Sequence, residues 1–297
     1  MSKSSAFSAR SSHRSGKSMI AVRRASSSLT YVFLAILSLI WILPIVWVVF
    51  TSFRAEAGSF VPYFLPKSWT FQNYVNLFNN TVYPFRKWFA NTMLVAVCSC
   101  LVSSFLTLTI SYVLSRMRFK LRKPYMNMAL ILGMFPGFMS MIAVYYVLKS
   151  IGLTHTLLAL VIVYSAGAGI NYYICKGFFD TIPHALDEAA KLDGATNFQI
   201  FTKVIMPLSG PIMVYTSLMA FMAPWGDFIF ARIIMGDDYN KWTVAIGMYQ
   251  MIAKDNISKY FTQFNAGCVL IGIPIVIMYV IMQRFYVQGV TGGAVKN

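Results

Sequence analysis

The chain has 297 residues, of which 58% are hydrophobic and only 11% are charged. A water-soluble fold cannot bury so large an apolar share, because an ordinary globular domain is about half apolar and about one quarter charged. The formal net charge of +16 would suit a nucleic-acid partner, but apart from Phe119 no aromatic residue lies among the clustered basic residues. The composition therefore argues against a nucleic-acid partner and predicts a polytopic membrane protein.

Six apolar segments are long enough to cross the hydrocarbon layer, which takes a helix of about 20 residues. They are almost continuously apolar and lack the two-residue alternation of barrel strands, so we predict an all-α fold with six transmembrane helices. The segments are residues 29–53, 88–114, 125–148, 156–174, 211–235 and 266–286. They define a transmembrane domain over residues 29–286, with tails at 1–28 and 287–297.

Basic residues mark one side of this predicted domain. The tail at 1–28 is basic, rich in serine and poor in large apolar residues, which predicts a disordered segment. The link between the second and third spans is also basic, with Arg116, Arg118, Lys120, Arg122 and Lys123. Six spans place this link and both tails on the same side, which the positive-inside rule assigns to the cytoplasm. We expect the basic link to contact anionic lipid headgroups.

Residues 71–78, in the first outer loop, carry apolar side chains at helical spacing, from Phe71 through Tyr74 to Phe78. Amide side chains lie between them, which predicts a short amphipathic helix. Such a helix either lies in the plane of the lipid headgroups or faces an external partner.

Polar and helix-breaking residues interrupt the third and fourth spans. Gly133, Pro136 and Gly137 predict a break in the third span, which is either a plain kink or a place where freed carbonyls line a cavity. In the fourth span, Asn171 and Tyr172 offer hydrogen-bonding groups and an aromatic face, which suit an uncharged sugar. Close packing between helices explains the same residues.

The fifth span contains Asp227, an ionisable residue in a segment predicted to cross the membrane. Such a residue is a candidate functional site by default. A position near the outer end of the helix also allows it to reach water or pair with a neighbour. Trp225 beside it would either stack on a sugar ring or lie in the interfacial belt. Asp227, Trp225, Asn171 and Tyr172 are therefore our candidates for a substrate path.

Patterns for catalysis and metal binding are missing from the sequence. The four cysteines lie in apolar segments and the three histidines are scattered, so we predict neither a metal site nor a Cys/His nucleophile. We find no glycine-rich phosphate loop and no paired carboxylates within a span. We therefore predict a protein that is not an enzyme and binds no cofactor of its own.

Residues 183–211 form a polar interruption between two apolar segments on the predicted cytoplasmic side. Pro183 can start a helix, and Asp187 and Glu188 would lie near that start, where the helix dipole favours negative charge. Gly194 predicts a sharp stop, because glycine tolerates the left-handed conformation that such an exit needs.

A second short helix is expected from Thr196 to a point before Pro207. The two helices and the glycine turn would make a compact unit with a small apolar face at Ala189 and Ala190. That face suits docking into a cleft, whereas a purely interfacial helix would only lie on lipid.

The spacing in this interruption resembles a known family. Glu188-Ala189-Ala190, then Gly194, then Val204-Ile205-Met206-Pro207 look like the EAA loop of binding-protein-dependent ABC importers. The likeness runs from about residue 29 to the end and is similar to the carbohydrate-type permeases. The other matching residues are Asn73-Tyr74, Leu77-Phe78, Trp88-Phe89, Asn91-Thr92, Pro207-Leu208, Pro211, Trp225 and Asp227-Phe228. The tail at 287–296 is similar to that of the smaller membrane subunit of maltose/maltodextrin importers.

This resemblance implies a type I ABC importer transmembrane domain in a bacterial cell membrane, with both termini in the cytoplasm. The chain would form half of the path for maltose, maltodextrin or a related oligosaccharide, together with a second, different membrane permease subunit. A cytoplasmic ATPase dimer would bind the ATP, and an extracellular sugar-binding protein would contact the loop at 236–265.

The resemblance also assigns residues to the contact with the ATPase. In the loop at 183–211 these are Glu188, Ala189, Ala190, Asp193, Gly194 and Pro207, and in the C-terminal tail they are Gln288, Gly289, Thr291 and Gly292. Two other classes of protein stay open. An ion-coupled secondary transporter would need buried carboxylates near the midplane, for which Asp227 alone gives support. A membrane scaffold would have no substrate path and no ATPase partner.

Overall fold

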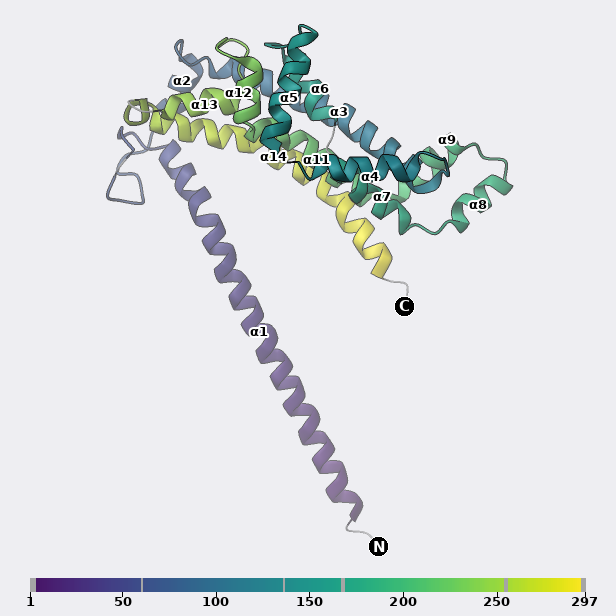
Figure 1. Ribbon diagram of the computed structural model, residues 1–297. Helices are drawn as coiled ribbons and strands as arrows, with labels where there is room; N and C mark the ends of the chain where they lie inside the picture. Colours follow the sequence, from purple (N-terminus) through teal and green to yellow (C-terminus); the bar gives the residue numbers. More distant parts are fainter. Residues whose placement is uncertain (1–3, 60, 136, 167–168, 254–255, 295–297) are drawn as a thin grey trace.

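The computed structural model describes residues 4–59, 61–135, 137–166, 169–253 and 256–294, and within these ranges the side chains of 4–26, 29, 169–170 and 284–294 lie outside the description. The described backbone forms helices and loops, and its only β-type pairing is an isolated bridge between Arg54 and Trp69. The predicted all-α fold is confirmed (Figure 1).

The helices follow one another along the chain. They are α1 (Ser4–Ser52), α2 (Gln72–Asn79), α3 (Phe85–Arg116), α4 (Arg122–Gly133), α5 (Gly137–Ser150), α6 (Leu157–Ala166), α7 (Gly169–Asp180), α8 (Ala185–Leu192), α9 (Asn197–Gln199), α10 (Met206–Leu208), α11 (Gly210–Gly226), α12 (Ile229–Met235), α13 (Val244–Ile252) and α14 (Ile257–Ala294). A π-helical segment, η1 (Ile200–Ile205), connects α9 to α10.

Within the described part of the chain, three helices are single spans by length and hydropathy: Thr30–Ser52 of α1, the whole of α3, and Ile257–Gln283 of α14. Three bent helix pairs bring the number of spans to as many as six. The bend is 107° between α4 and α5, 42° between α6 and α7, and 87° between Asn197–Leu208 and α11. The six predicted spans agree with this count, and the break predicted near Gly133 and Gly137 separates α4 from α5.

Several spans differ from the prediction at their ends. The helix of α1 continues N-terminally through residues 4–28, which the sequence predicts to be disordered. Between residues 4 and 43 no proline and one glycine, Gly16, interrupt the helix. α14 begins at Ile257 rather than at 266, and the predicted fifth span is divided at Asp227 into α11 and α12.

α3 lies at the centre of the bundle, where it packs against α6, α7 and α11. Ser99, Ser103 and Ser111 of α3 are buried, and such small side chains allow helices to approach closely. α1 diverges from the bundle and contacts α14 near its own C-terminal end, where the Trp47 ring packs against Phe261 (Figure 1).

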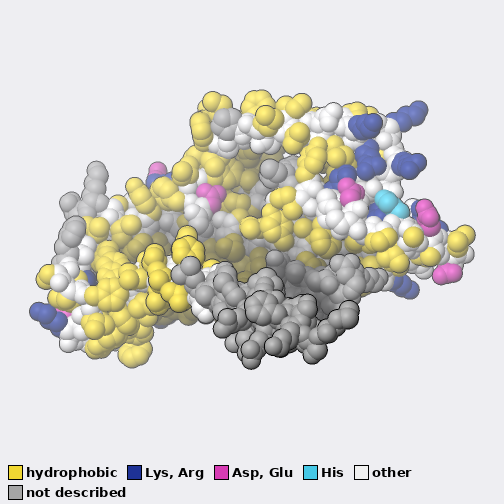
Figure 2. All heavy atoms as spheres, turned by 90° about the horizontal axis from the view of Figure 1, so that it is seen from below, with side chains coloured by type: hydrophobic (Ala, Val, Ile, Leu, Met, Phe, Trp, Pro, Cys, Tyr) yellow, Lys and Arg dark blue, Asp and Glu magenta, His cyan; other side chains and the backbone are white. Residues whose placement is uncertain are grey.

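Short helices lie at two opposite ends of the bundle (Figure 1). We call the end with α2, α12 and α13 the outer end, and the end with α8 and α9 the loop end. The amphipathic helix predicted at 71–78 is present as α2, with Leu77 buried and Phe71 exposed. Figure 2 shows apolar side chains spread along the bundle and several Lys and Arg side chains gathered at the loop end.

Each end has its own hydrophobic cluster. The outer cluster includes Trp88, Trp242 and Phe230, and the inner cluster includes Tyr112, Phe179, Ile200 and Ile205. Gly247 of α13 is essential to the outer cluster, because a Cβ there would lie 2.0 Å from Cε3 of the fully buried Trp88.

Candidate functional site

Helix α8 opens the polar segment at residues 183–211. It begins at Ala185, after a turn in which the Leu186 N–H donates to the Pro183 carbonyl at 3.3 Å. Pro183 therefore precedes the helix instead of starting it, which corrects the sequence prediction. Asp187 and Glu188 lie in the first turn as predicted, where the helix dipole favours negative charge.

Gly194 ends α8 in the left-handed conformation, with a φ angle of +82°. The Gly194 N–H donates to the Lys191 carbonyl at 3.0 Å, and the Ala195 N–H donates to the Ala190 carbonyl at 2.9 Å. These two bonds form a Schellman motif, which satisfies carbonyls left free at a helix end. A Cβ at Gly194 would meet no atom within 4 Å. Backbone conformation therefore requires glycine here, and the predicted stop is confirmed.

The second helix of the segment begins at a capping box. The Gln199 N–H donates to Thr196 Oγ1 at 3.3 Å, and the Thr196 N–H donates to Gln199 Oε1 at 2.8 Å. The helix continues through η1 and past Pro207 to Leu208, so the prediction that it ends before Pro207 is wrong. Pro207 follows the π-helical turn and takes an early position in α10, where a missing N–H is tolerated.

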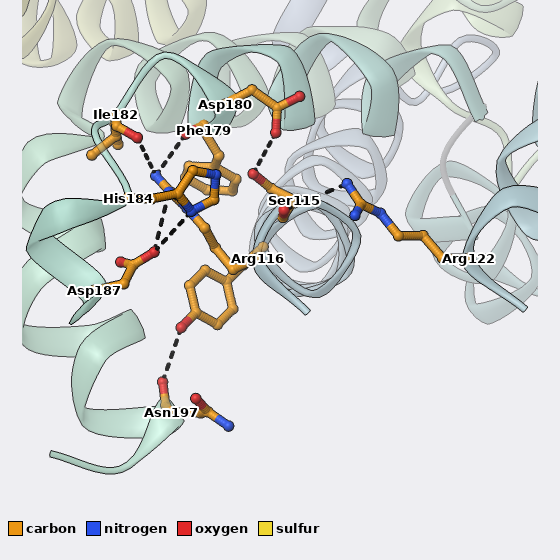
Figure 3. A network of polar contacts seen from close by, with 10 residues as sticks. Ser115, Arg116, Arg122, Phe179, Asp180, Ile182, His184, Asp187 and Asn197 are labelled. Atoms are coloured by element: carbon orange, nitrogen blue, oxygen red, sulfur yellow. Dashed lines mark hydrogen bonds and ion pairs between the residues drawn. The ribbon is translucent and has the colours of Figure 1, made fainter. Parts of the chain in front are cut away.

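Arg116, the last residue of α3, joins three elements at the loop end (Figure 3). Its side chain is 4% exposed, and its Nη1 lies 3.1 Å from Asp187 Oδ2 in α8. Its Nη2 donates to the carbonyl oxygens of Phe179 at 2.8 Å and of Ile182 at 2.7 Å, at the end of α7. Arg116 therefore links α3 to α8 through an ion pair and to the end of α7 through two charge-assisted hydrogen bonds.

His184 adds a fourth partner to this network. Its Nδ1 lies 2.8 Å from Arg116 Nη1. Because a guanidinium group only donates hydrogen bonds, Nδ1 accepts and a neutral imidazole carries its proton on Nε2. The ring lies just before α8 and points back toward the end of α3 (Figure 3).

The Arg116–Asp187 ion pair is shielded from water, since the Asp187 side chain is 9% exposed. Within the described residues, Arg116 Nε and Asp187 Oδ1 have no hydrogen-bond partner. Removing one member of a buried pair costs about 3–5 kcal/mol, because the other charge is left without compensation. Each of the two side chains therefore depends on the other to remain buried as a charged group.

Further polar contacts surround this pair. Ser115 Oγ donates to Asp180 Oδ1 at 2.6 Å, and Lys176 forms an ion pair with the same carboxylate. The Tyr112 hydroxyl donates to the Asn197 carbonyl at 3.2 Å, which connects α3 to α9. The end of α3 is therefore bonded to both short helices of the polar segment and to α7.

A cavity of about 820 Å³ lies between the end of α3, α7 and α8. Charged side chains dominate its lining, which includes Arg116, Arg118, Arg122, Asp180, Asp187, Glu188 and Lys191. The sequence predicts a lipid-headgroup contact for the whole basic link. For Arg116 that prediction is wrong, because its side chain is buried against protein.

The predicted ATPase-contact residues of the loop lie largely on its surface. Glu188, Ala189, Asp193, Gly194 and Pro207 are exposed, and Ala190 is half-buried against the inner cluster. Large apolar side chains are exposed beside them: Leu186, Leu192 at 90% and Phe198 at 72%. Lys191 and Lys203 are also exposed, so the loop presents a surface of mixed charge and apolar side chains away from the bundle.

Asp227 is held by hydrogen bonds at the break between α11 and α12. The Tyr164 hydroxyl donates to Asp227 Oδ2 at 2.8 Å, and the Phe230 N–H donates to Oδ1 at 3.0 Å. Asp227 therefore caps the start of α12, as a carboxylate does at a helix N-terminus. The sequence allowed Asp227 either to reach water or to pair with a neighbour. In the structure its carboxylate pairs with the Tyr164 hydroxyl.

Trp225, by contrast, lies in the interior, with 4% of its surface exposed. Its ring packs against Phe89 at 5.3 Å and Phe221 at 6.0 Å between centroids. Within the described residues its indole N–H has no hydrogen-bond partner. Neither an interfacial belt nor an open stacking face matches this position.

Asn171 lines a small cavity of about 140 Å³ between α3, α6, α7 and α11. Its polar lining also includes Tyr164, Tyr215, Ser103, Thr107 and Thr216. Tyr172 is buried elsewhere, and its hydroxyl donates to the Ala166 carbonyl at 2.8 Å. The structure thus brings Asn171 near Asp227 through Tyr164, and it leaves Trp225 and Tyr172 out of this cavity.

The predicted tail contacts Gln288, Gly289, Thr291 and Gly292 fall in the last turns of α14, where side chains lie outside the described residues. Two site residues, Arg116 and Tyr164, are missing from the sequence prediction. No spacing rule places Arg116 against Asp187, because the two residues lie on elements far apart in the chain. No spacing rule connects Tyr164 to Asp227.

Comparison with known proteins identifies the class. Residues 107–292 match the family "Binding-protein-dependent transport system inner membrane component". The galactooligosaccharides transport system permease protein GanQ of Bacillus subtilis (strain 168) is 31% identical, covering 90% of this chain and 95% of GanQ. The maltodextrin transport system permease protein MalD of Streptococcus pneumoniae (strain ATCC BAA-255 / R6) is 32% identical, covering 93% of this chain and 97% of MalD.

The fold is shared with a solved membrane protein. A chain of a bacterial ABC transporter involved in the import of the acidic polysaccharide alginate matches with a TM-score of 0.73 and 21% identity, covering 89% of this chain and 97% of that chain. The fold is therefore that of an ABC importer transmembrane domain. The chain belongs to the family of binding-protein-dependent transport system inner membrane components.

Proposed function

We propose that this chain is the membrane permease subunit of an ATP-driven importer for maltose, maltodextrin or a related oligosaccharide. Relatives named for maltodextrin and for galactooligosaccharides support a sugar substrate. The observation that carries the proposal is the segment 183–211, which we call the coupling loop. It is a rigidly capped pair of short helices that stands at one end of the bundle with an unpartnered apolar surface.

The coupling loop is proposed to dock on a cytoplasmic ATPase subunit, which binds the ATP that this chain does not. Moving a two-state transporter from 1:99 to 99:1 takes about 5.5 kcal/mol. Complete burial of one large apolar side chain contributes about 1.5–3 kcal/mol. Burial of Leu192 and Phe198 would therefore give a contact strong enough to transmit a free-energy difference of this order from the ATPase, with Glu188 and Asp193 beside them to fix its orientation.

Two further partners fit surfaces at other places in the molecule. The most apolar part of Thr30–Ser52 has no buried residue, so lipid and a second, different permease subunit are its proposed neighbours. At the outer end, Tyr239 and Tyr249 are exposed within the region 236–265. We assign them to the contact with an extracellular sugar-binding protein. With the coupling loop in the cytoplasm, both termini lie there too.

The substrate path is proposed to pass the cavity that Asn171 lines. Hydroxyl, amide and aromatic groups surround it, and none of its lining residues is charged. Such a lining suits a sugar, which offers hydroxyl groups and an apolar C–H face. Asp227 holds the Tyr164 side chain, which lines this cavity, by accepting a hydrogen bond from its hydroxyl. Trp225 and Tyr172 contribute to this region by packing and by the hydrogen bond from the Tyr172 hydroxyl to the Ala166 carbonyl.

Purification of the tagged chain from its native membranes tests the proposal. We expect an ATPase and a second permease to copurify. In proteoliposomes with the binding protein, uptake of radiolabelled maltotriose, or of galactobiose as a second probe, should require ATP and survive an ionophore. Uptake without ATP that collapses with the ion gradient would instead identify a secondary transporter. Copurification without any ATPase would identify a scaffold.

A further inference from the structure

We propose that Arg116 is a positioning residue that makes α3, α7 and α8 move as one body when the ATPase moves α8. This inference rests on the proposed function and adds a named residue to it. Arg116 lies behind the exposed surface of the coupling loop, at the junction of these three helices.

The first observation is that the two terminal nitrogens of the Arg116 guanidinium group contact different helices. Nη1 forms an ion pair with Asp187 in α8, and Nη2 donates to the two carbonyls at the end of α7. The side chain itself extends from the end of α3. Five donors in one rigid plane make such a three-way connection possible, and the planar group resists a change in the angles between its partners.

The second observation is the cavity beside the pair. A volume of about 820 Å³ separates α8 from the end of α3 and from α7. Side-chain packing therefore does not fill this side of α8, and polar contacts bridge it. Besides Arg116, the described contacts from α3 to the loop include the Tyr112–Asn197 hydrogen bond and packing of the Tyr112 ring on Phe201 at 4.8 Å between centroids, which reach α9 and η1 and not α8.

The third observation is the packing of α3 against other helices of the bundle. α3 packs against α6, α7 and α11, the helices that line the smaller polar cavity with Asn171 and Tyr164. A displacement of α8 that reaches α3 and α7 through Arg116 therefore acts on the walls of the proposed sugar path. Without Arg116, a displacement of α8 would lose its direct polar connection to α3 and to the end of α7.

The test uses the complete transporter in proteoliposomes and measures maltotriose molecules imported per ATP hydrolysed. Arg116→Lys keeps the positive charge but replaces the planar guanidinium group, with its separate Nη1 and Nη2, by a single ammonium nitrogen. Asp187→Asn removes the negative charge of its partner. We expect each variant to lower this ratio at least 5-fold while ATP hydrolysis continues. The double variant should import no fewer maltotriose molecules per ATP than the more impaired of the two single variants, because both substitutions break the same connection. Lys120→Arg, a charge-conserving change at an exposed position on the same link and outside the cavity lining, is the matched control and should keep the wild-type ratio.

Subunit stoichiometry and the thermal unfolding midpoint are recorded for every variant. A wild-type ratio in an assembled Arg116→Lys transporter would overturn the inference. Failure of that conservative variant to assemble would also overturn it, since Arg116 would then be a purely structural residue. Absence of ATP-driven uptake in the wild-type transporter would refute the proposed function itself, so the two failures are distinguishable.

Discussion

The outer end and the loop end of the bundle are held together in different ways. At the outer end, large aromatic side chains such as Trp88 and Trp242 are fully buried, and Gly247 lets a backbone approach them. At the loop end, the Arg116–Asp187 pair spans a polar cavity, while Leu192 and Phe198 are exposed. The outer end is a filled core, and the loop end is an incomplete one.

This difference indicates where the molecule is complete and where it requires a partner. Filled packing resists deformation, because interiors at crystal-like density have few alternative arrangements. At the loop end a smaller cluster around Phe179, Ile200 and Ile205 is packed, but α8 beyond it is held mainly by directional polar contacts and has apolar side chains turned outward, which suits docking and movement. Mutations should therefore reduce stability at the outer end and reduce coupling at the loop end.

The largest expected effect is at the outer end. Gly247→Ala places a Cβ 2.0 Å from the buried Trp88 ring, and the overpacking should cost about 3 kcal/mol or more. We expect a marked fall in the thermal unfolding midpoint and in the yield of assembled protein. Gly272→Ala, in open space on α14, is the matched control. Equal midpoints for the two variants would contradict the filled-core description.

The second effect is on coupling. Glu188→Lys places a positive charge in the first turn of α8, where it opposes the helix dipole on the surface proposed to dock. Sugar uptake should fall at least 10-fold while the unfolding midpoint stays within about 1 °C. Lys67→Glu, a charge reversal at an exposed position of the first outer loop, should leave ATP-driven uptake near normal. Normal uptake by Glu188→Lys would remove the loop from the mechanism.

A smaller effect is expected at the glycine turn. Gly194→Ala forces an L-residue into the left-handed region, which costs about 1–2 kcal/mol. The exit of α8 should shift, and uptake should fall several-fold with little change in unfolding. Gly177→Ala, within α7 and also in open space, is the control. Comparable uptake in both variants would show that the turn geometry does not matter.

The smallest effect concerns the capping box. Thr196→Ala removes the side-chain acceptor for the Gln199 N–H and should cost about 1 kcal/mol. Hydrogen exchange of amides over residues 197–202 should speed up by about 5-fold, as mass spectrometry of peptides can measure. Thr202→Ala, which removes only a bond back to the Phe198 carbonyl, should change exchange much less.

The sequence was sufficient for the features that depend on local rules. Apolar length predicted the spans, and the need for a left-handed residue predicted the turn at Gly194. The sequence predicted that the helix would end before Pro207, whereas it continues to Leu208. A π-helical turn precedes the proline and changes which carbonyl its missing N–H would have bonded. The Arg116–Asp187 pair joins residues far apart in the chain, and the count of basic residues gave no sign of which one is buried. Tyr164 and Asp227 were missed as a pair for the same reason.

Photocrosslinking at Leu192 tests the central claim most directly. A benzophenone amino acid at this position, in the assembled transporter, should form an adduct with the ATPase subunit, and the same group at Phe105 on the exposed side of α3 should not. The adduct should depend on an intact coupling loop and be lost in Glu188→Lys. An active transporter whose Leu192 probe yields no ATPase adduct would contradict the assignment of residues 183–211 as the coupling loop.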